Sequence, residues 1–216
     1  MAAIEAVSLR HVGRGDLARK RGELRDVIRA AAIVEFAEHG LRGASTQGIA
    51  DRAGISKTKL HYYIDSKEEL YAEALSQITA IWAELFEGIA LDKGPEAFLS
   101  DYIARKVRFS LSHPAEVRMF TGEVMRGAPM LQEVWAGSRE ATLRASALIT
   151  GWADQGLIRR VDPLLLQFHI WAMTEAYAVM GSEARFMSGL GPDDPLNADH
   201  ISAEITALVL NGLRVQ

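Results

Sequence analysis

A short run of cationic, hydroxyl and aromatic residues in the first third of the chain is well suited to contact a polyanion. Lys57 and Lys59 supply ammonium groups for phosphates and guanine edges, and the methyl group of Thr58 can meet a thymine methyl. Leu60 and Tyr63 stand three positions apart, so in a helix both would pack inward and leave their neighbours on the outer face. This pattern is typical of a helix that reads the major groove of DNA.

Capping residues divide the surrounding segment into short helices. Ser45 can cap a first helix, Gly54 can form the following turn, and Ser56 can cap the second helix, which carries the cationic run. This order predicts a helix-turn-helix, whose second helix enters the major groove while the first braces it. Ser66 and Glu69 form a capping box that opens a long helix. A helical hairpin with merely solvated lysines would show the same periodicity, so the residue pattern leaves both interpretations open.

The charges are distributed unevenly along the chain. It has 216 residues, of which 49% are hydrophobic and 24% charged, and a formal net charge of −4. Residues 1–67 carry 12 Lys and Arg against 8 Asp and Glu, whereas residues 68–216 carry 12 against 20. A basic end on an acidic body suggests that only this end meets a polyanion, but an ordinary solvated surface would carry the same excess of charge, so the charge alone leaves both interpretations open.

Several classes of protein are disfavoured by what the sequence lacks. It contains no cysteine, which excludes disulfides, thiolate metal sites and cysteine nucleophiles. Its six histidines are scattered, and it has neither a zinc-protease signature nor a phosphate-binding glycine loop. No apolar run reaches the roughly 18 residues of a membrane span, and no secretion signal is recognisable. We therefore expect a cytoplasmic protein with no catalytic residues, no metal and no cofactor.

The predicted fold is all-α. Apolar residues recur at helical spacing, and there is no convincing run of alternating β-branched residues. We expect a basic, flexible arm over residues 1–21, a helix-turn-helix domain over 22–67, and a helical domain over 68–216 whose first helix connects the two. Glycines and prolines delimit further helices at about 95–111, 115–126, 130–155, 163–187 and 198–213.

The N-terminal part resembles the DNA-binding domain of TetR-family transcriptional regulators. The similarity is carried by Ile49-Ala50, Gly54-Ile55-Ser56-Lys57, Leu60-His61-Tyr62-Tyr63-Ile64 and Ser66-Lys67-Glu68-Glu69-Leu70. The chain departs from the usual pattern at His61, where Tyr is common, at Ile64, where Phe is common, and at Gly48, where a side chain is common. The resemblance implies that DNA is contacted by Ser45, Gln47, Lys57, Thr58, Lys59, His61, Tyr62 and Lys67.

Short C-terminal motifs are similar to members of this family that respond to uracil and thymine. They are Tyr102-Ile103-Ala104-Arg105-Lys106, Gly127-Ala128-Pro129, Gly151-Trp152, Asp162-Pro163 and Ile170-Trp171-Ala172. This resemblance implies a small-molecule effector, but Glu175 stands where those regulators carry Gln. Gln can both donate and accept hydrogen bonds, as a uracil amide edge requires, whereas ionised Glu only accepts. An unrelated metabolite is therefore the alternative effector.

A small-molecule pocket needs an apolar lining with a few convergent polar groups. Trp171 and Glu175 are four positions apart, so both can point into the same space from one face of a helix. The alternative is that these side chains fill the core or that Trp171 packs in a dimer interface. The full set of expected ligand-binding residues is Trp82, Met119, Phe120, Glu123, Trp171 and Glu175.

A homodimer is expected because one recognition helix covers only a few base pairs, and two copies raise affinity and specificity. The last two helices carry more apolar residues than one buried stripe needs, which fits the intersubunit bundle that the resemblance implies. The sequence thus predicts a dimeric, ligand-responsive regulator, most simply a repressor, that binds a palindromic double-stranded operator. A helical protein-interaction module and an all-α enzyme are the alternatives.

Overall fold

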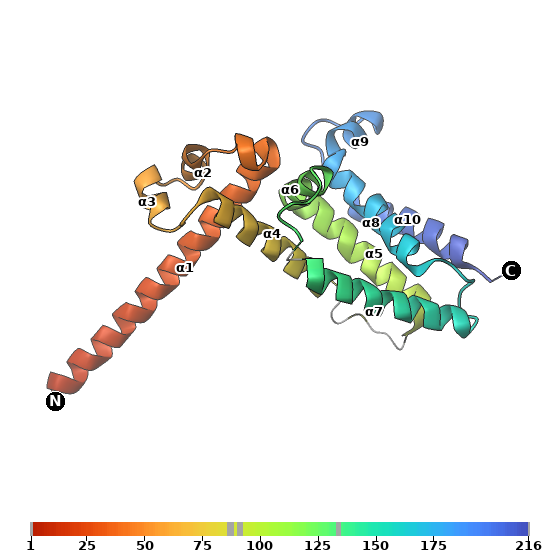
Figure 1. Ribbon diagram of the computed structural model, residues 1–216, viewed down its shortest axis with the longest axis horizontal. Helices are drawn as coiled ribbons and strands as arrows, with labels where there is room; N and C mark the ends of the chain where they lie inside the picture. The colour runs from red at the N-terminus through yellow and green to blue at the C-terminus, as the bar shows by residue number, and fades with distance from the viewer. Residues whose placement is uncertain (1, 86–88, 90–92, 133–134, 216) are drawn as a thin grey trace. The chain divides into compact units, whose positions relative to one another are not determined.

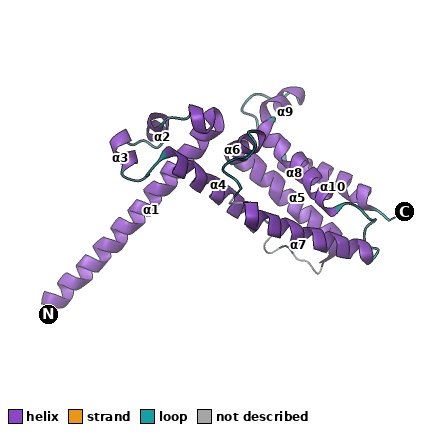
Figure 2. Cartoon of the chain, in the orientation of Figure 1, coloured by secondary structure: helices purple, strands orange, loops and turns teal. Residues whose placement is uncertain are grey.

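The computed structural model describes residues 2–85, 89, 93–132 and 135–215, and for residues 2–15, 17 and 136 it describes the backbone alone. In these ranges every regular element is a helix, as predicted (Figures 1 and 2). The chain divides into two compact units, Met1–Ala74 and Leu75–Gln216. Within the described ranges, no helix is long and apolar enough to cross a membrane.

The first unit is built around one long helix and two short ones. Its helices are α1 (Ala2–Gly43), α2 (Thr46–Arg52), α3 (Lys57–His61) and the first turns of α4 (Lys67–Glu84). Ile28, Ala32 and Phe36 recur every four residues on α1, and all three are buried. Phe36 meets Tyr71 of α4 edge to face, with the ring centroids 4.9 Å apart. Leu60 of α3 is fully buried, which fixes the outward orientation of the rest of that helix.

The N-terminal residues of the chain belong to α1. We expected a basic, flexible arm over residues 1–21; the backbone is helical from Ala2 and continues into the helix that packs in the first unit, and the flexibility of this segment stays a prediction. Charged pairs at helical spacing support this stretch, because Asp16 pairs with Arg19 and Lys20, and Arg19 also pairs with Glu23. Apolar periodicity does not reveal such a stretch, because its support comes from pairs of opposite charge.

The second unit is a helical bundle with α5 at its centre. It comprises the end of α4 with α5 (Gly94–Ser112), α6 (Pro114–Met125), α7 (Trp135–Asp154), α8 (Pro163–Val179), α9 (Gly181–Met187) and α10 (Ala198–Leu213). Helix α5 packs against α6, α7, α8 and α10 (Figure 1). Phe98, Ile103 and Val107 of α5 are buried in the same core cluster as Trp152 of α7 and Ile170 of α8.

Two of the expected helices have other limits in the structure. The single helix expected over 163–187 is divided into α8 and α9, because the backbone at Met180 leaves the helical region (φ −106°, ψ 25°). The helix expected over 130–155 begins at Trp135, and residues 133–134 lie outside the described residues. In α8, Asp162 accepts the N–H groups of Leu164 and Leu165, at 2.9 and 3.0 Å, and so caps the first turn.

Candidate nucleic-acid interface and ligand cavity

The predicted helix-turn-helix is present, with its caps formed. The Ser45 hydroxyl accepts the N–H of Gly48 at 2.9 Å, and the Ser56 hydroxyl accepts the N–H of Lys59 at 3.2 Å. Gly54 has a φ of +66°, the left-handed conformation that the turn between α2 and α3 requires. The Ser66 hydroxyl accepts the N–H of Glu69 at 3.0 Å and starts α4 as predicted.

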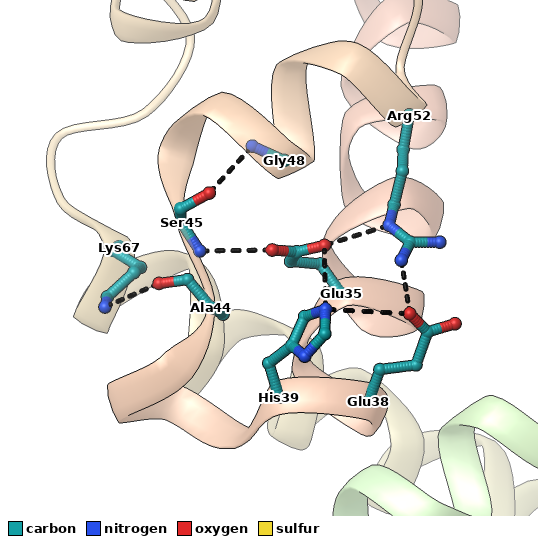
Figure 3. A network of polar contacts seen from close by, with 8 residues as sticks. All are labelled: Glu35, Glu38, His39, Ala44, Ser45, Gly48, Arg52 and Lys67. Atoms are coloured by element: carbon teal, nitrogen blue, oxygen red, sulfur yellow. Dashed lines mark hydrogen bonds and ion pairs between the residues drawn. The ribbon is translucent and has the colours of Figure 1, made fainter.

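One buried carboxylate holds both ends of α2 against α1 (Figure 3). Glu35 Oε1 accepts the backbone N–H of Ser45 at 3.2 Å, just before α2 begins. Glu35 Oε2 accepts Nε of Arg52, the last residue of α2, at 2.9 Å. The Arg52 guanidinium also pairs with Glu38, and the His39 ring lies 3.7 Å from the Glu38 carboxylate. Charge-assisted bonds of this kind fix the orientation of the helix that braces α3.

The acidity of Glu35 reflects these bonds. Burial raises the pKa of the Glu35 carboxyl, but the Ser45 N–H, the Arg52 guanidinium and the nearby His39 outweigh it, and the pKa lies below its ordinary value. Glu35 is not among the residues expected from the sequence. A signal was available, because this acidic residue stands one position before Phe36, within the buried stripe of α1.

The position of Glu35 explains why residue 48 is a glycine. A Cβ atom at Gly48 would lie 2.4 Å from Glu35 Oε1 and 2.7 Å from the carboxyl carbon. Real Cβ atoms essentially never come this close to another heavy atom, so a side chain at position 48 would require the Glu35 carboxylate or α2 to shift. The departure from the family pattern at Gly48 therefore goes together with the carboxylate of Glu35, which occupies the space of the missing side chain.

The residues expected to contact DNA are nearly all exposed. On and after α3, these are Lys57, Thr58, Lys59, His61 and Tyr62, and 71% of the Tyr62 surface is accessible. They form one continuous surface because Leu60 faces the core. Their contacts with DNA stay predictions.

Three further expected contacts lie at the starts of α2 and α4. Ser45 and Gln47 are exposed, and the Gln47 side chain donates to Asp51 Oδ1 at 2.7 Å. Lys67 is half-buried, and its Nζ donates to the carbonyl of Ala44 at 2.9 Å (Figure 3). An ammonium group has three N–H donors, so this bond ties α4 to the start of α2 and leaves donors for a phosphate.

Four of the six expected ligand-binding residues line one cavity in the second unit. These are Trp82 of α4, Phe120 of α6, and Trp171 and Glu175 of α8, around a volume of about 160 Å³. The Trp82 and Phe120 rings meet edge to face, with centroids 4.3 Å apart. The remaining lining comes from Thr79, Ala83, Tyr102, Lys106, Trp135, Ser138, Ala141 and Thr142.

Lys106 and Tyr102 of α5 provide polar groups in the pocket that were not expected from the sequence. Lys106 is 3% exposed, and its Nζ lies 2.6 Å from Glu175 Oε1 and 4.6 Å from the centroid of the Trp82 ring. The Tyr102 hydroxyl accepts Nε1–H of Trp171 at 3.0 Å. Burial is the main cause that raises the pKa of the Tyr102 hydroxyl, so this group stays protonated at neutral pH. Tyr102 and Lys106, four positions apart on α5, thus face Trp171 and Glu175, four positions apart on α8.

Met119 and Glu123 of α6, which were also expected to bind the ligand, do not line this cavity. Both are buried, with 1% and 2% of their surface accessible. Glu123 instead holds the turn after α6, because its carboxylate accepts the N–H of Met130 at 3.0 Å and pairs with Arg126 at 3.3 Å. A position on a helix does not show which side of the core a side chain faces, so these two residues could not be assigned from the sequence.

Comparison with known proteins agrees with this architecture. Residues 28–74 match the family described as bacterial regulatory proteins, tetR family, and residues 75–216 match the family described as YcdC-like protein, C-terminal region. The chain belongs to the TetR family of transcriptional regulators, a class of DNA-binding proteins that are not enzymes. The alternatives of a solvated hairpin and of an all-α enzyme are thereby set aside.

Two proteins that are similar to this chain along most of its length are regulators of transcription. The HTH-type transcriptional regulator RutR of Escherichia coli (strain K12) is 33% identical over 201 residues, which cover 93% of this chain and 95% of RutR. The HTH-type transcriptional repressor KstR2 of Mycobacterium tuberculosis (strain H37Rv) is 26% identical, over 92% of this chain and 95% of KstR2.

Solved structures share the fold. The structure of the ketosteroid transcriptional regulator KstR2 superposes with a TM-score of 0.67 at 24% identity, covering 91% of this chain and 96% of that one. The structure of AibR in complex with isovaleryl coenzyme A and operator DNA has a TM-score of 0.60 at 20% identity, covering 86% and 96%. The all-α fold with an N-terminal helix-turn-helix and a C-terminal helical domain is thus confirmed.

Proposed function

We propose that this protein is a repressor that binds a palindromic operator as a homodimer and is released by a small molecule. The observation that carries the proposal is the cavity of the second unit, whose aromatic walls meet the ion pair of Lys106 and Glu175. Such a combination of apolar lining and few polar groups is the usual form of a small-molecule site. The exposed surface of α3, with its capped start, supports the DNA-binding half of the proposal.

The cavity supports a single-ring effector. An engineered apolar cavity of about 150 Å³ admits benzene, so a volume of about 160 Å³ suits one small ring. Trp82 and Trp171 offer faces on which a flat ring can stack. The ammonium of Lys106 donates and the carboxylate of Glu175 accepts, so together they complement an edge that presents a carbonyl beside an N–H. Uracil and thymine have this edge, which makes a pyrimidine the effector that we propose.

The exchange of Gln for Glu at position 175 does not contradict a pyrimidine effector. A single glutamine amide would supply both the donor and the acceptor for such an edge. In this chain Lys106 supplies the donor and Glu175 the acceptor, and the two charges compensate each other. A metabolite with a different arrangement of donors and acceptors remains the second candidate, since the acceptor carries a full charge.

Helix α4 supports a mechanism in which the effector alters DNA binding. It begins with Lys67 beside the helix-turn-helix and carries Trp82 of the cavity near its other end. A ligand that shifts Trp82 would shift α4 along its whole length, and with it the spacing of the two recognition helices in a dimer. Linkage then requires that the ligand bind the DNA-free form more tightly, and that DNA weaken ligand binding by the same factor.

Exposed apolar side chains on α8 and α10 support the homodimer. Leu165 and Phe168 of α8 and Leu208 of α10 are 51%, 46% and 67% accessible. Leu165 and Leu208 border one open apolar groove, and Leu208 also borders a second. Apolar patches of this kind on a protein surface usually mark an interface.

The experiment that tests the proposal measures operator binding against effector concentration. The operator is a duplex that the purified protein selects from a random library, and its affinity is followed by fluorescence anisotropy at fixed salt. We expect uracil or thymine at saturation to lower operator affinity at least fivefold, and DNA to lower uracil affinity equally. An operator affinity that does not change at saturating ligand would contradict release by a pyrimidine. If no duplex is enriched, the DNA-binding role itself fails.

A further inference from the structure

Helix α1 holds one guanidinium beside the recognition helix. Cζ of Arg21 lies 5.5 Å from the ring centroid of Tyr62 and 5.9 Å from that of Tyr63. The two rings meet edge to face, with their centroids 5.6 Å apart. Attraction between a guanidinium and aromatic faces restricts the side chain. Arg21 is therefore held next to the C-terminal end of α3, at the exposed ring of Tyr62.

Among the side chains that the structure describes, no carboxylate pairs with Arg21. Its neighbours Arg19 and Lys20 both pair with Asp16, at 2.6 and 3.2 Å. Arg19 pairs in addition with Glu23. For Arg21, by contrast, the side chains that the structure describes offer two tyrosine rings and no carboxylate within 4 Å. The side chain is exposed, so the charge is free to meet an anion from outside.

The helical spacing of arginines extends this surface along α1. Positions 10, 14, 21 and 25 are all Arg, and separations of four, seven and four residues put them on one face of a helix. The same face continues with Ile28 and Ala32, which are buried in the core of the first unit. On the N-terminal side of the core, the face of α1 that packs inside the first unit therefore carries arginines.

We propose that this arginine face is a second DNA-contacting surface, on which Arg21 binds the phosphate backbone that flanks the site read by α3. The inference rests on the proposed DNA binding by α3. A guanidinium binds phosphate oxygens through two parallel N–H donors. Stacking on Tyr62 already orients those donors in the DNA-free protein, so less side-chain entropy is lost on binding. Contacts of this type add affinity and fix the protein on the duplex without reading its sequence.

The test compares Arg21→Ala with Lys20→Ala, its neighbour of equal charge that is already paired with Asp16. Affinity is measured between 50 and 200 mM salt for two duplexes, the operator selected by the wild-type protein and an unrelated sequence of the same length. Each duplex extends about ten base pairs beyond the half-sites. Arg21→Ala should weaken binding to both duplexes by a similar factor. It should also reduce the slope of log affinity against log salt by about 0.9 per protomer, or about 3.5-fold in affinity across this salt range.

Further variants make the outcome decisive. Arg21→Lys keeps the charge but lacks the planar fork, so it should fall between the wild type and Arg21→Ala. Single flanking phosphates are also replaced by uncharged methylphosphonates. At one position this replacement should lower the DNA affinity of the wild type but leave the affinity of Arg21→Ala unchanged. The inference is overturned if Arg21→Ala retains the wild-type slope, or loses no more affinity than Lys20→Ala. If the wild-type protein binds neither duplex, the proposed function itself fails, and that result is recognised before any variant is compared.

Discussion

The ammonium of Lys106 and the carboxylate of Glu175 lie 2.6 Å apart in the wall of the cavity and join α5 to α8. Lys106 is almost fully buried, and Glu175 exposes a fifth of its side chain. Because the two charges compensate each other, the cavity as a whole favours an uncharged ligand that offers an acceptor and a donor side by side. The pair has a second role, since an isolated charge at this depth would be costly.

Lys106→Met should weaken the binding of uracil or thymine at least tenfold. A hydrogen bond to a charged group contributes about 1.5–3 kcal/mol, and methionine keeps the volume of the side chain without its donors. Quenching of tryptophan fluorescence reports binding, because Trp82, Trp135 and Trp171 border the cavity. Met119→Leu is the matched control, since Met119 is buried on α6 outside the lining. Equal affinity in Lys106→Met and in the wild type would exclude this ion pair from the ligand site.

The same pair should show strong coupling in the stability of the protein. Lys106→Met or Glu175→Leu alone leaves one charge unpaired and should lower the free energy of unfolding by about 1–3 kcal/mol. The double variant removes both charges and should be less destabilised than the sum of the single variants. Urea denaturation of the four proteins, without ligand, gives the coupling energy. Additive effects would mean that the two side chains are solvated separately.

Two glycines of the first unit should respond to alanine with opposite signs. Gly48→Ala places a Cβ atom 2.4 Å from Glu35 Oε1, so α2 or the carboxylate must move. We expect a loss of about 1–3 kcal/mol in the free energy of unfolding. At Gly22 of α1 a Cβ atom meets nothing within 4 Å, so Gly22→Ala should stabilise the helix by up to about 1 kcal/mol. A Gly48→Ala protein as stable as the wild type would show that Glu35 does not occupy this space.

The local parts of this structure could be predicted from the sequence, because their causes are local. Ser45, Ser56 and Ser66 accept the N–H groups that the capping patterns predicted. The i,i+4 relation of Trp171 and Glu175 likewise places both in one cavity, since helical geometry alone decides it. The resemblance to a family then supplied the functional meaning, which periodicity had left open.

What could not be predicted depends on contacts between distant segments. Lys106 and Glu175 are 69 positions apart, and only the packing of α5 on α8 brings them together. In the sequence, Glu35 is a charged residue among the buried positions of α1. Its partners Ser45 and Arg52 follow 10 and 17 positions later in the chain, so its role depends on how α2 packs against α1. Met119 and Glu123 show the converse, because inward-facing positions on α6 do not reveal which cavity they reach.

The stability of the first unit should decrease in acid through Glu35. The Glu35 carboxyl has a pKa below its ordinary value of 4.5 when folded, so the unfolded chain binds its proton first. Its stabilising contribution is therefore complete above about pH 4.5 and is lost as the pH falls through the lower, folded pKa. Glu35→Gln removes this titration, so its unfolding free energy should fall less steeply between pH 5 and 3 than that of the wild type. Parallel curves for the two proteins would show that the Ser45 and Arg52 bonds do not depend on the charge.

Lys59→Ala tests the exposed face of α3 without disturbing its core. Lys59 is exposed, and the cap at Ser56 uses only its backbone N–H, so the helix should remain intact. If Lys59 contacts a phosphate, affinity should fall on any duplex, and the salt slope should decrease by about 0.9 per protomer. If it reads a guanine edge, the loss should be about 1–3 kcal/mol on the operator and much smaller on an unrelated sequence.

A matched control for Lys59→Ala lies in the second unit. Lys93 is exposed just before α5, so Lys93→Ala removes the same charge away from the helix-turn-helix. Its operator affinity and salt slope should equal those of the wild type. Equal losses in the two variants would point to the net charge of the protein as the cause. Wild-type behaviour of Lys59→Ala on both duplexes would remove Lys59 from the interface, and DNA contact by α3 would then depend on Lys57, Thr58 and His61.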